Sequence, residues 1–282
     1  MLEFREEAKD ATKLNIRKLC FDGPQEELTK TANQQPCILT VTAAVWSIIK
    51  SETDFFPDFY AGHSLGEYSA LVAAEKLSLS KAASLVYQRG LAMQKAVPEG
   101  QGAMAAILNF TVEQLVELCT LVADQLSQCV EIVNFNSPQQ LIISGHKEAV
   151  NLVCQKLEGE DKVRCMSLPV SAPFHSKLMA PAREDMTPLL QKTELSQSDY
   201  LIIANLTGNI ESQYSVEHLI KQIDNPVLWT QTLETAHQEG CQRFVEVGPG
   251  KVLFGLARKT LPKGLTLLHT SDIQNTIKEL QA

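Results

Sequence analysis

The sequence lacks the features that place a chain in a membrane or direct it out of the cell. No apolar stretch approaches the roughly 18 uninterrupted residues that a membrane-spanning helix requires. The first residues, MLEFREEAKDATK, contain no apolar core of the kind found in secretory signals. We therefore expect neither membrane association nor secretion.

The sequence also lacks the cysteine spacings that mark zinc sites. Its seven cysteines are scattered and odd in number, and none forms a C-x-x-C pair. Such usage is typical of reduced thiols, so we expect a cytoplasmic location, no disulfide framework and no metal site.

Positive charge is scarce as well. The net charge is −8, which disfavours general binding to nucleic acid, and an acidic partner would require a local basic patch. The hydrophobic fraction of 44% and the charged fraction of 21% are those of an ordinary globular protein. With 282 residues, the chain has room for one large domain that carries a smaller insert.

The order of expected elements divides the chain into two parts. Residues 100–169 predict a β-α-β-β-α-β block, the pattern of a ferredoxin-like module. The flanking residues, 1–99 and 170–282, alternate between helices and strands, which indicates a mostly parallel sheet covered on both faces. We therefore predict an α/β fold, with a discontinuous large domain and a small inserted subdomain.

The pentapeptide Gly62-His63-Ser64-Leu65-Gly66 is the first candidate for chemistry. A G-x-S-x-G match occurs by chance in roughly one chain in ten of this length. Here a predicted strand leads in and a predicted helix leads out, which is the setting of a nucleophile elbow. The glycines would let two backbones pass closely, and the Leu65 N–H at the helix start could stabilise an oxyanion. The alternative is a turn that only starts a helix.

A serine nucleophile needs a base, and His175 is the best placed of the six histidines. It lies in the Pro-bounded segment LPVSAPFHSKLM, where the chain re-enters the large domain, and clefts form at such junctions. No acid is obviously placed between Ser64 and His175, and about 107 residues follow the histidine. That order disfavours an ordinary lipase or esterase.

Six segments together make the chain resemble the malonyl-CoA:acyl carrier protein transacylases, the acyltransferases of fatty-acid and polyketide synthesis. They occur in the family's order and spacing: GHSLGEYSALVAA, YQRGLAMQKAVPEGQGAMAAI, VNFNSPQQLIISGHKEAV, LPVSAPFHSKLM, QIDNPVLWTQTLE and FVEVGPGKVLFGL. The resemblance implies a hydrolase-like α/β domain with an inserted ferredoxin-like subdomain. It also implies a cytoplasmic monomer without a cofactor, for which malonyl-CoA is a substrate and acyl carrier protein a partner.

The resemblance assigns roles residue by residue. It implies that Ser64 is the nucleophile, that His175 is its base and that the backbone carbonyl of Gln222 orients the histidine. It implies that Arg89, in "QRG", anchors the free carboxylate of the substrate through a bidentate pair. Without that context, a lone arginine on an apolar helix is most often solvated.

Five further residues are weaker candidates for binding the substrate or the carrier protein. Asn134 and Asn136 in "VNFNSP" could line the cleft, although such turns are ordinarily structural. Lys162, Arg164 and Lys177 could dock an acidic carrier near the junction of the two parts, although a solvated surface is the alternative for each.

Two other functions remain open from the sequence. One is an acyl hydrolase that clears carrier proteins, which would have no use for a buried cation at position 89. The other is a weakly active or non-catalytic carrier-binding relative, because the chain begins after the buried strand and Gly-Gln loop with which the family normally starts. On that basis we expect the family fold in outline, poor stability and weak activity.

Overall fold

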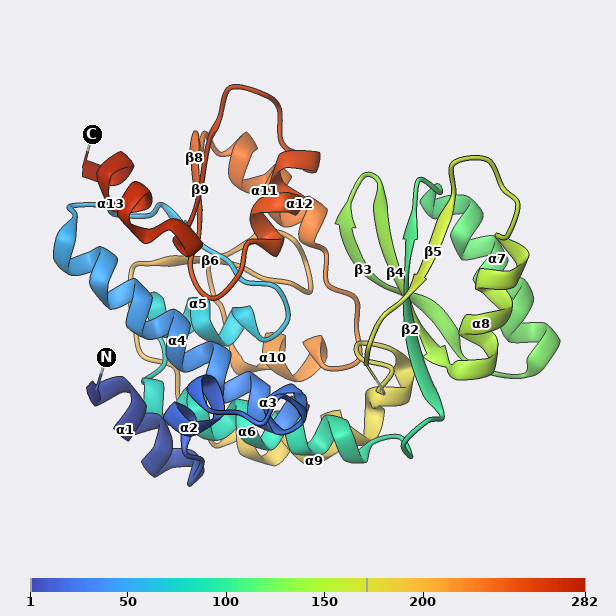
Figure 1. Cartoon of the computed structure of the whole chain (residues 1–282), viewed down its shortest axis with the longest axis horizontal. Coiled ribbons are helices and arrows are strands. Elements are labelled where there is room, and N and C mark those ends of the chain that lie inside the picture. The colour runs from blue at the N-terminus through green and yellow to red at the C-terminus, as the bar shows by residue number, and fades with distance from the viewer. Residues whose placement is uncertain (1, 171, 282) are drawn as a thin grey trace.

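Two parts of unequal size make up the molecule (Figure 1). The computed structural model describes residues 2–170 and 172–281; Met1, Ser171 and Ala282, which belong to the predicted large domain, lie outside the described residues. The part on the right of Figure 1 contains strands β2 to β5, and the helix-rich part on the left contains both ends of the described chain.

The elements follow the chain in three groups. The first group is α1 (Leu2–Thr12), α2 (Ile16–Phe21), α3 (Gln25–Thr29), α4 (Thr31–Glu52), β1 (Phe59–Tyr60), α5 (Gly66–Ala73) and α6 (Leu79–Lys95). The second group is β2 (Gly102–Leu108), α7 (Val112–Leu126), β3 (Val130–Ser137), β4 (Gln140–His146), α8 (Lys147–Lys156) and β5 (Arg164–Ser167). The third group is α9 (Ala180–Gln191), β6 (Leu201–Ile203), β7 (Ile210–Glu211), α10 (Val216–Gln222), α11 (Trp229–Gln238), β8 (Arg243–Glu246), α12 (Val252–Thr260), β9 (Thr266–His269) and α13 (Ile273–Gln281), with 3-10 turns at Lys177–Met179 and Thr270–Asp272.

The second group forms the predicted β-α-β-β-α-β block. Its strands lie in the order β3-β4-β2-β5, and all three neighbouring pairs are antiparallel. Alternate residues face opposite sides of the sheet, so Ala105, Ile107 and Ile143 pack under α7 and α8. Met104 and Ala106 face the other way and pack near Phe174 of the large part. The ferredoxin-like module is thus confirmed.

The described residues of the large part form two small sheets rather than the single predicted sheet. Strand β1 pairs in parallel with β6, which pairs with β7, and β8 pairs in parallel with β9. The parallel pairings agree with the predicted α/β class. Most of the core is helical, and α4 and α6 contribute Leu39, Ile49, Leu85 and Val86 to the main hydrophobic cluster.

Edge strand β3 joins the two parts through backbone hydrogen bonds. Val227, just before α11, accepts from the Phe135 N–H at 3.0 Å and donates to the Val133 carbonyl at 2.9 Å. This edge of the sheet is therefore held against the large part rather than exposed to water.

Two predicted helix starts are wrong. The apolar positions after Pro36 predict a helix that starts at that proline, but α4 begins at Thr31 and Pro36 lies inside it. Burial of Ala32 and Pro36 offsets the helical hydrogen bond that the proline removes. The sequence also predicts a helix from Lys81 to about Val97 that is capped by Ser80, but α6 begins at Leu79 and its cap is Ser78, whose Oγ accepts from Lys81 N–H at 3.3 Å. The burial of Leu79 moves the helix start toward the N-terminus.

The expectation that every cysteine is a free thiol is also wrong. Cys154, in α8, is joined to Cys165, in β5, as a disulfide. The small subdomain brings their Cα atoms to 5.5 Å, a separation that disulfides commonly span. A separation of 11 residues in sequence does not reveal this proximity. Among the described helices, none is long and apolar enough to span a bilayer.

Candidate active site

Ser64 lies in a strained turn between β1 and α5. Its φ of 53° falls in the left-handed region, which costs a residue other than glycine about 1–3 kcal/mol. Asn205 holds the turn on both sides, because its Oδ1 accepts from Ser64 N–H at 2.6 Å and its Nδ2 donates to the Gly62 carbonyl at 2.6 Å. The strain and its support agree with a nucleophile elbow.

The two glycines of the pentapeptide differ in their surroundings. A Cβ at Gly62 would lie 2.0 Å from the Gly66 carbonyl oxygen, so no side chain fits there. A Cβ at Gly66 would meet nothing within 4 Å. The expectation that both glycines allow a close backbone approach therefore holds only for Gly62, because the approach occurs at the Cα of Gly62 alone.

His175 lies against the serine hydroxyl. Its Nε2 is 2.7 Å from Ser64 Oγ, and its Nδ1 is 2.9 Å from the backbone carbonyl of Gln222. A carbonyl only accepts, so Nδ1 carries the proton and Nε2 is free to accept from the serine. His175 also has a positive φ, 62°. Burial, followed by the charge of Arg89, lowers the pKa of His175 to about 3, so the ring is neutral near pH 7.

Arg89 is a buried cation that points at the same serine. Its side chain is 2% exposed, and its Nη2 donates to Ser64 Oγ at 3.0 Å. Nη1 donates to Gln35 Oε1 and Nη2 also donates to Gln222 Oε1, each at 2.9 Å. Burial lowers the pKa of Arg89. No carboxylate of the described chain forms a salt bridge with it, so its charge has no direct counter-ion.

The side chain of Gln222 links several of these groups. Besides accepting from Arg89, it donates from Nε2 to the Ser64 carbonyl at 3.0 Å and to Glu67 Oε2. Glu67 is fully buried in the first turn of α5, and its Oε1 accepts from Asn205 N–H at 3.1 Å.

The backbone N–H of Leu65 lies where the sequence placed an oxyanion donor. Leu65 directly precedes α5, so its N–H is among the unpaired donors at that helix start. Within the described residues it has no hydrogen-bond acceptor. The group is therefore available to a ligand beside Ser64.

The small subdomain contributes two asparagines through β3. Asn136 Oδ1 accepts from His63 Nε2 at 2.8 Å, so the ring beside the nucleophile turns away toward the small sheet. Asn134 is 5% exposed, and its Nδ2 has no acceptor among the described residues. Both asparagines line the same cavity as Ser64.

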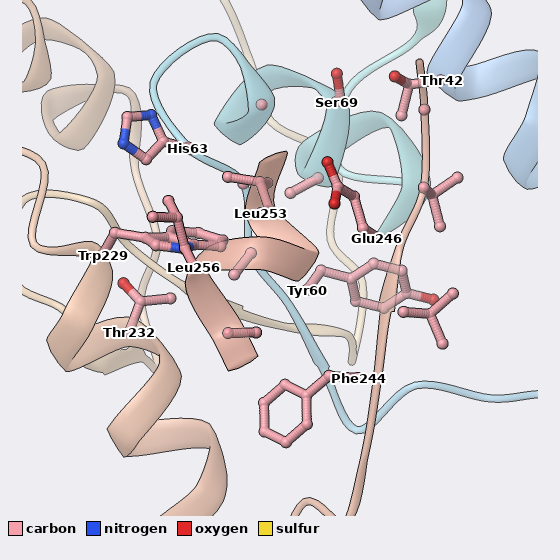
Figure 2. A pocket seen from close by; sticks show the side chains of 18 of the residues that line it. Thr42, Tyr60, His63, Ser69, Trp229, Thr232, Phe244, Glu246, Leu253 and Leu256 are labelled. Carbon is pink, nitrogen blue, oxygen red and sulfur yellow. The ribbon is translucent and has the colours of Figure 1, made fainter. Parts of the chain in front are cut away.

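That cavity has a volume of about 1010 Å³ and extends well beyond the reacting groups. Figure 2 shows part of its wall, with His63 and Trp229 on one side and Tyr60, Phe244 and Glu246 on the other. The volume lies at the upper end of the range for ligand pockets.

The three surface cations do not form one patch. Arg164 begins β5, at the edge of the sheet opposite β3, and pairs with Leu108 at the end of β2 remote from Gly102. Lys162 precedes it and is 82% exposed. The expectation that these two lie near the junction is therefore wrong. Lys177 does lie there, because its N–H donates to Glu131 Oε1 of β3 at 2.7 Å.

Three polar residues of the site were missed from the sequence: Gln35, Glu67 and Asn205. Glu67 has the only usable signal, because it is the one charge in the otherwise apolar run that follows Ser64. Gln35 and Asn205 have no local pattern that distinguishes them. No described group of histidines, cysteines and acids could hold a metal ion.

Comparison with known proteins places this geometry in a family context. The acyl transferase domain matches residues 1–276. A malonyl CoA-acyl carrier protein transacylase of Bacillus subtilis is 40% identical over 269 residues, which cover 95% of this chain and 84% of that protein. The crystal structure of FabD from Acinetobacter baumannii has a TM-score of 0.93 and 36% identity, covering 99% of this chain and 89% of that one.

A further similar structure is a complex of two proteins, a type II polyketide synthase acyl-carrier protein and its malonyl-transacylase. The matched chain has a TM-score of 0.90 and 36% identity, and the match covers 98% of this chain and 90% of that one.

Proposed function

The chain belongs to the acyl transferase domain family, and from that premise we propose that it transfers a malonyl group from coenzyme A to the phosphopantetheine thiol of an acyl carrier protein. The product would feed fatty-acid or polyketide synthesis. The transfer proceeds in two steps through an ester on Ser64, as in other reactions with an activated serine.

In the first step, His175 Nε2 takes the hydroxyl proton as Ser64 Oγ attacks the thioester carbonyl carbon. The Leu65 N–H stabilises the oxyanion that forms. The carbon–sulfur bond then breaks, and the coenzyme A sulfur leaves with the proton from His175. In the second step the carrier thiol gives its proton to His175 and its sulfur attacks the ester carbonyl carbon. The bond from that carbon to Ser64 Oγ then breaks, and Oγ takes the proton back from His175. Neither step changes an oxidation state, and Ser64 and His175 supply the nucleophile, the base and the acid, so the proposal includes no cofactor.

The buried charge of Arg89, which forms no salt bridge within the described chain, is the observation that carries this proposal. A buried guanidinium within 3.0 Å of Ser64 Oγ, without a carboxylate partner in the described chain, suits a substrate that brings its own carboxylate. That carboxylate would also offset the positive charge that lowers the pKa of His175, and so strengthen the base when malonyl is bound.

Labelled malonyl-CoA tests the acyl-enzyme directly. We expect one labelled group per chain, located on Ser64 by peptide mapping, and no label in the Ser64→Ala variant. Label that persists in Ser64→Ala would refute the mechanism. A protein that binds the carrier without ever acquiring label would instead be a non-catalytic module.

The role of Arg89 separates malonyl transfer from hydrolysis of uncharged acyl groups. We expect Arg89→Ala to slow acylation by malonyl-CoA about 10–100-fold more than acylation by acetyl-CoA, because a charge-assisted bond contributes about 1.5–3 kcal/mol. Equal losses for the two donors would remove the carboxylate role.

Carrier docking remains a separate proposal, and Lys177 is its best candidate, because it lies two residues from His175. We expect Lys177→Glu to slow transfer to the acidic carrier several-fold at low salt, with acylation by malonyl-CoA unchanged. Lys162→Glu and Arg164→Glu, on the opposite edge of the sheet, are the matched controls. Cytoplasmic location and a monomeric state also remain proposals.

A further inference from the structure

Glu67 is a fully buried acid to which the proposed mechanism assigns no part. It stands three residues after Ser64, in the first turn of α5. Burying a carboxyl group is costly unless its oxygens are satisfied. The contacts of this residue therefore indicate what the structure gains from it.

Both carboxyl oxygens accept hydrogen bonds, each from a residue that holds part of the site. Oε1 accepts from Asn205 N–H at 3.1 Å, and Oε2 accepts from Gln222 Nε2. Asn205 in turn binds the Ser64 N–H and the Gly62 carbonyl, on the two sides of the elbow.

The contact with Gln222 has a directional consequence. The two ends of an amide are chemically opposite, since the nitrogen donates and the oxygen accepts. With Nε2 directed to Glu67 and the Ser64 carbonyl, Oε1 faces Arg89 and accepts from Nη2 at 2.9 Å. A carboxylate only accepts, so it admits this orientation of the amide and disfavours the reverse one.

We propose that Glu67 is a positioning residue that orients Gln222 so that the amide oxygen holds the Arg89 guanidinium at Ser64. The assignment rests on the proposed function, because it assumes that Arg89 receives the malonyl carboxylate. Glu67 forms its hydrogen bonds with Asn205 and Gln222, and none of them is to the side chain of Ser64. Its effect on donor choice passes through Gln222, and its effect on the elbow passes through Asn205.

The role requires the ionised form of Glu67, in which both oxygens accept. Burial raises the pKa of Glu67 to about 7, against the lowering effects of hydrogen bonding by Asn205, Gln222 and Tyr214 and of the charge of Arg89. The other titratable groups that face it are Tyr68 on α5 and Tyr214 ahead of α10, and burial raises the pKa of both above its usual range. The carboxyl group therefore gains a proton as the pH falls below about 7, and it then loses an acceptor.

Glu67→Gln tests the proposal with little change in shape. The new amide places a donor against Gln222 or against Asn205 N–H. If Gln222 turns over to restore a bond, its nitrogen faces the donors of Arg89. We expect the ratio of malonyl to acetyl acylation rates, measured in single turnovers, to fall at least tenfold. Glu211→Gln, which alters a partly buried acid hydrogen-bonded to Thr207, is the matched control and should keep the wild-type ratio.

The pH dependence of the malonyl-to-acetyl ratio is a second measurement, and it does not change when part of the protein is unfolded. In the wild type, the malonyl-to-acetyl ratio should fall as the pH is lowered from 8 to 5, through the Glu67 pKa of about 7. In Glu67→Gln, the ratio should be low and independent of pH. A variant ratio that equals the wild-type ratio at every pH would overturn the proposal.

Gln222→Met keeps the test decisive if Glu67→Gln does not fold. It retains the backbone carbonyl that binds His175 and removes the amide group that links Glu67 to Arg89, together with its bond to the Ser64 carbonyl. We expect the same loss of ratio, with no further loss in the double variant. A wild-type ratio in Gln222→Met would overturn the proposal. Arg89→Ala separates failure of the proposed function from failure of the Glu67 role. If Arg89→Ala leaves the malonyl-to-acetyl ratio unchanged, the proposed function fails. If it lowers the ratio while Gln222→Met does not, only the role of Glu67 fails.

Discussion

The small sheet and the surroundings of Ser64 differ in backbone regularity: the first consists of long paired strands, and the second of short strands and an irregular turn. Strands β2, β3 and β4 contain 7, 8 and 7 residues and pair in long antiparallel ladders. Strands β1 and β6, which flank the elbow, contain 2 and 3 residues. Regular pairing satisfies backbone groups cheaply, so the small sheet offers a rigid edge for the cleft.

The site itself uses irregular backbone and buried charge. Ser64 and His175 both have positive φ values, and Glu67, Arg89 and His175 are all buried. Each of these features costs stability and needs support from neighbours. The comparison shows that the reacting groups are concentrated where the chain departs from regular structure, while the small subdomain supplies support and two asparagines. Four substitutions test this division of labour.

The largest effect should come from the irregular segment around His175. We expect His175→Ala to slow acylation of Ser64 by about 10⁴-fold, near the upper end for loss of a general base. The folded state should persist, because burial of a neutral ring is the main feature removed. Stopped-flow acylation and thermal melting are the measurements. A loss below about tenfold would mean that another group takes the serine proton.

In the small sheet, the largest effect should be on stability rather than on chemistry. Ile143 lies on β4 and is fully buried under the helices α7 and α8. We therefore expect Ile143→Ala to lower the free energy of unfolding by about 2–5 kcal/mol. Acylation per folded molecule should stay within about twofold. Denaturant titration and active-site labelling measure the two quantities. A large fall in acylation per folded molecule would show that the small sheet tunes the reacting groups themselves.

The elbow offers a matched pair of glycines. Gly62→Ala places a Cβ 2.0 Å from the Gly66 carbonyl oxygen, so the turn must open. We expect a loss of about 1–3 kcal/mol in stability and at least tenfold slower acylation. Gly66→Ala should change each quantity little, because its Cβ meets open space. Equal effects of the two substitutions would show that crowding is not what requires Gly62.

The smallest effect should appear where the two regions meet. Asn136→Ala removes the acceptor of His63, and a single hydrogen bond of this kind contributes about 1 kcal/mol, or roughly fivefold. We therefore expect acylation to slow by about that factor. Asn109→Ala, in the small subdomain but bonded to the Lys162 carbonyl away from β3, is the control and should match the wild type.

Secondary structure was most predictable where one pattern dominated. The sequence pattern predicts a helix over 229–238, which is the observed range of α11. It predicts strands over 103–108, 131–135, 141–144 and 163–168, which differ from β2 to β5 by one or two residues at most ends. Helix α9 was not predicted; Pro181 lies in its first turn, where proline is tolerated, but Pro188 lies inside the helix and disfavours it. Burial of Ala182, Met186 and Leu190 outweighs that local cost.

The site divides in a similar way. Ser64 was selected by its motif between a predicted strand and a predicted helix, and His175 by comparison with the five other histidines, so both were candidates from the residues themselves. Arg89 and Gln222 entered only through resemblance to a family, because neither has a local signal. The catalytic and binding roles of all four remain predictions that the experiments above address.

The sequence by itself determined the elbow turn, the inserted β-α-β-β-α-β block and the choice of serine and histidine, because these depend on neighbouring residues. Tertiary structure alone decided the partners. Gln222 and Ser64 are separated by 158 residues, Asn205 and Glu67 by 138, and Arg89 and Gln35 by 54. Local propensity carries no information about contacts at such separations. They arise when packing buries polar groups together, and each buried group must then find a hydrogen-bond partner within reach.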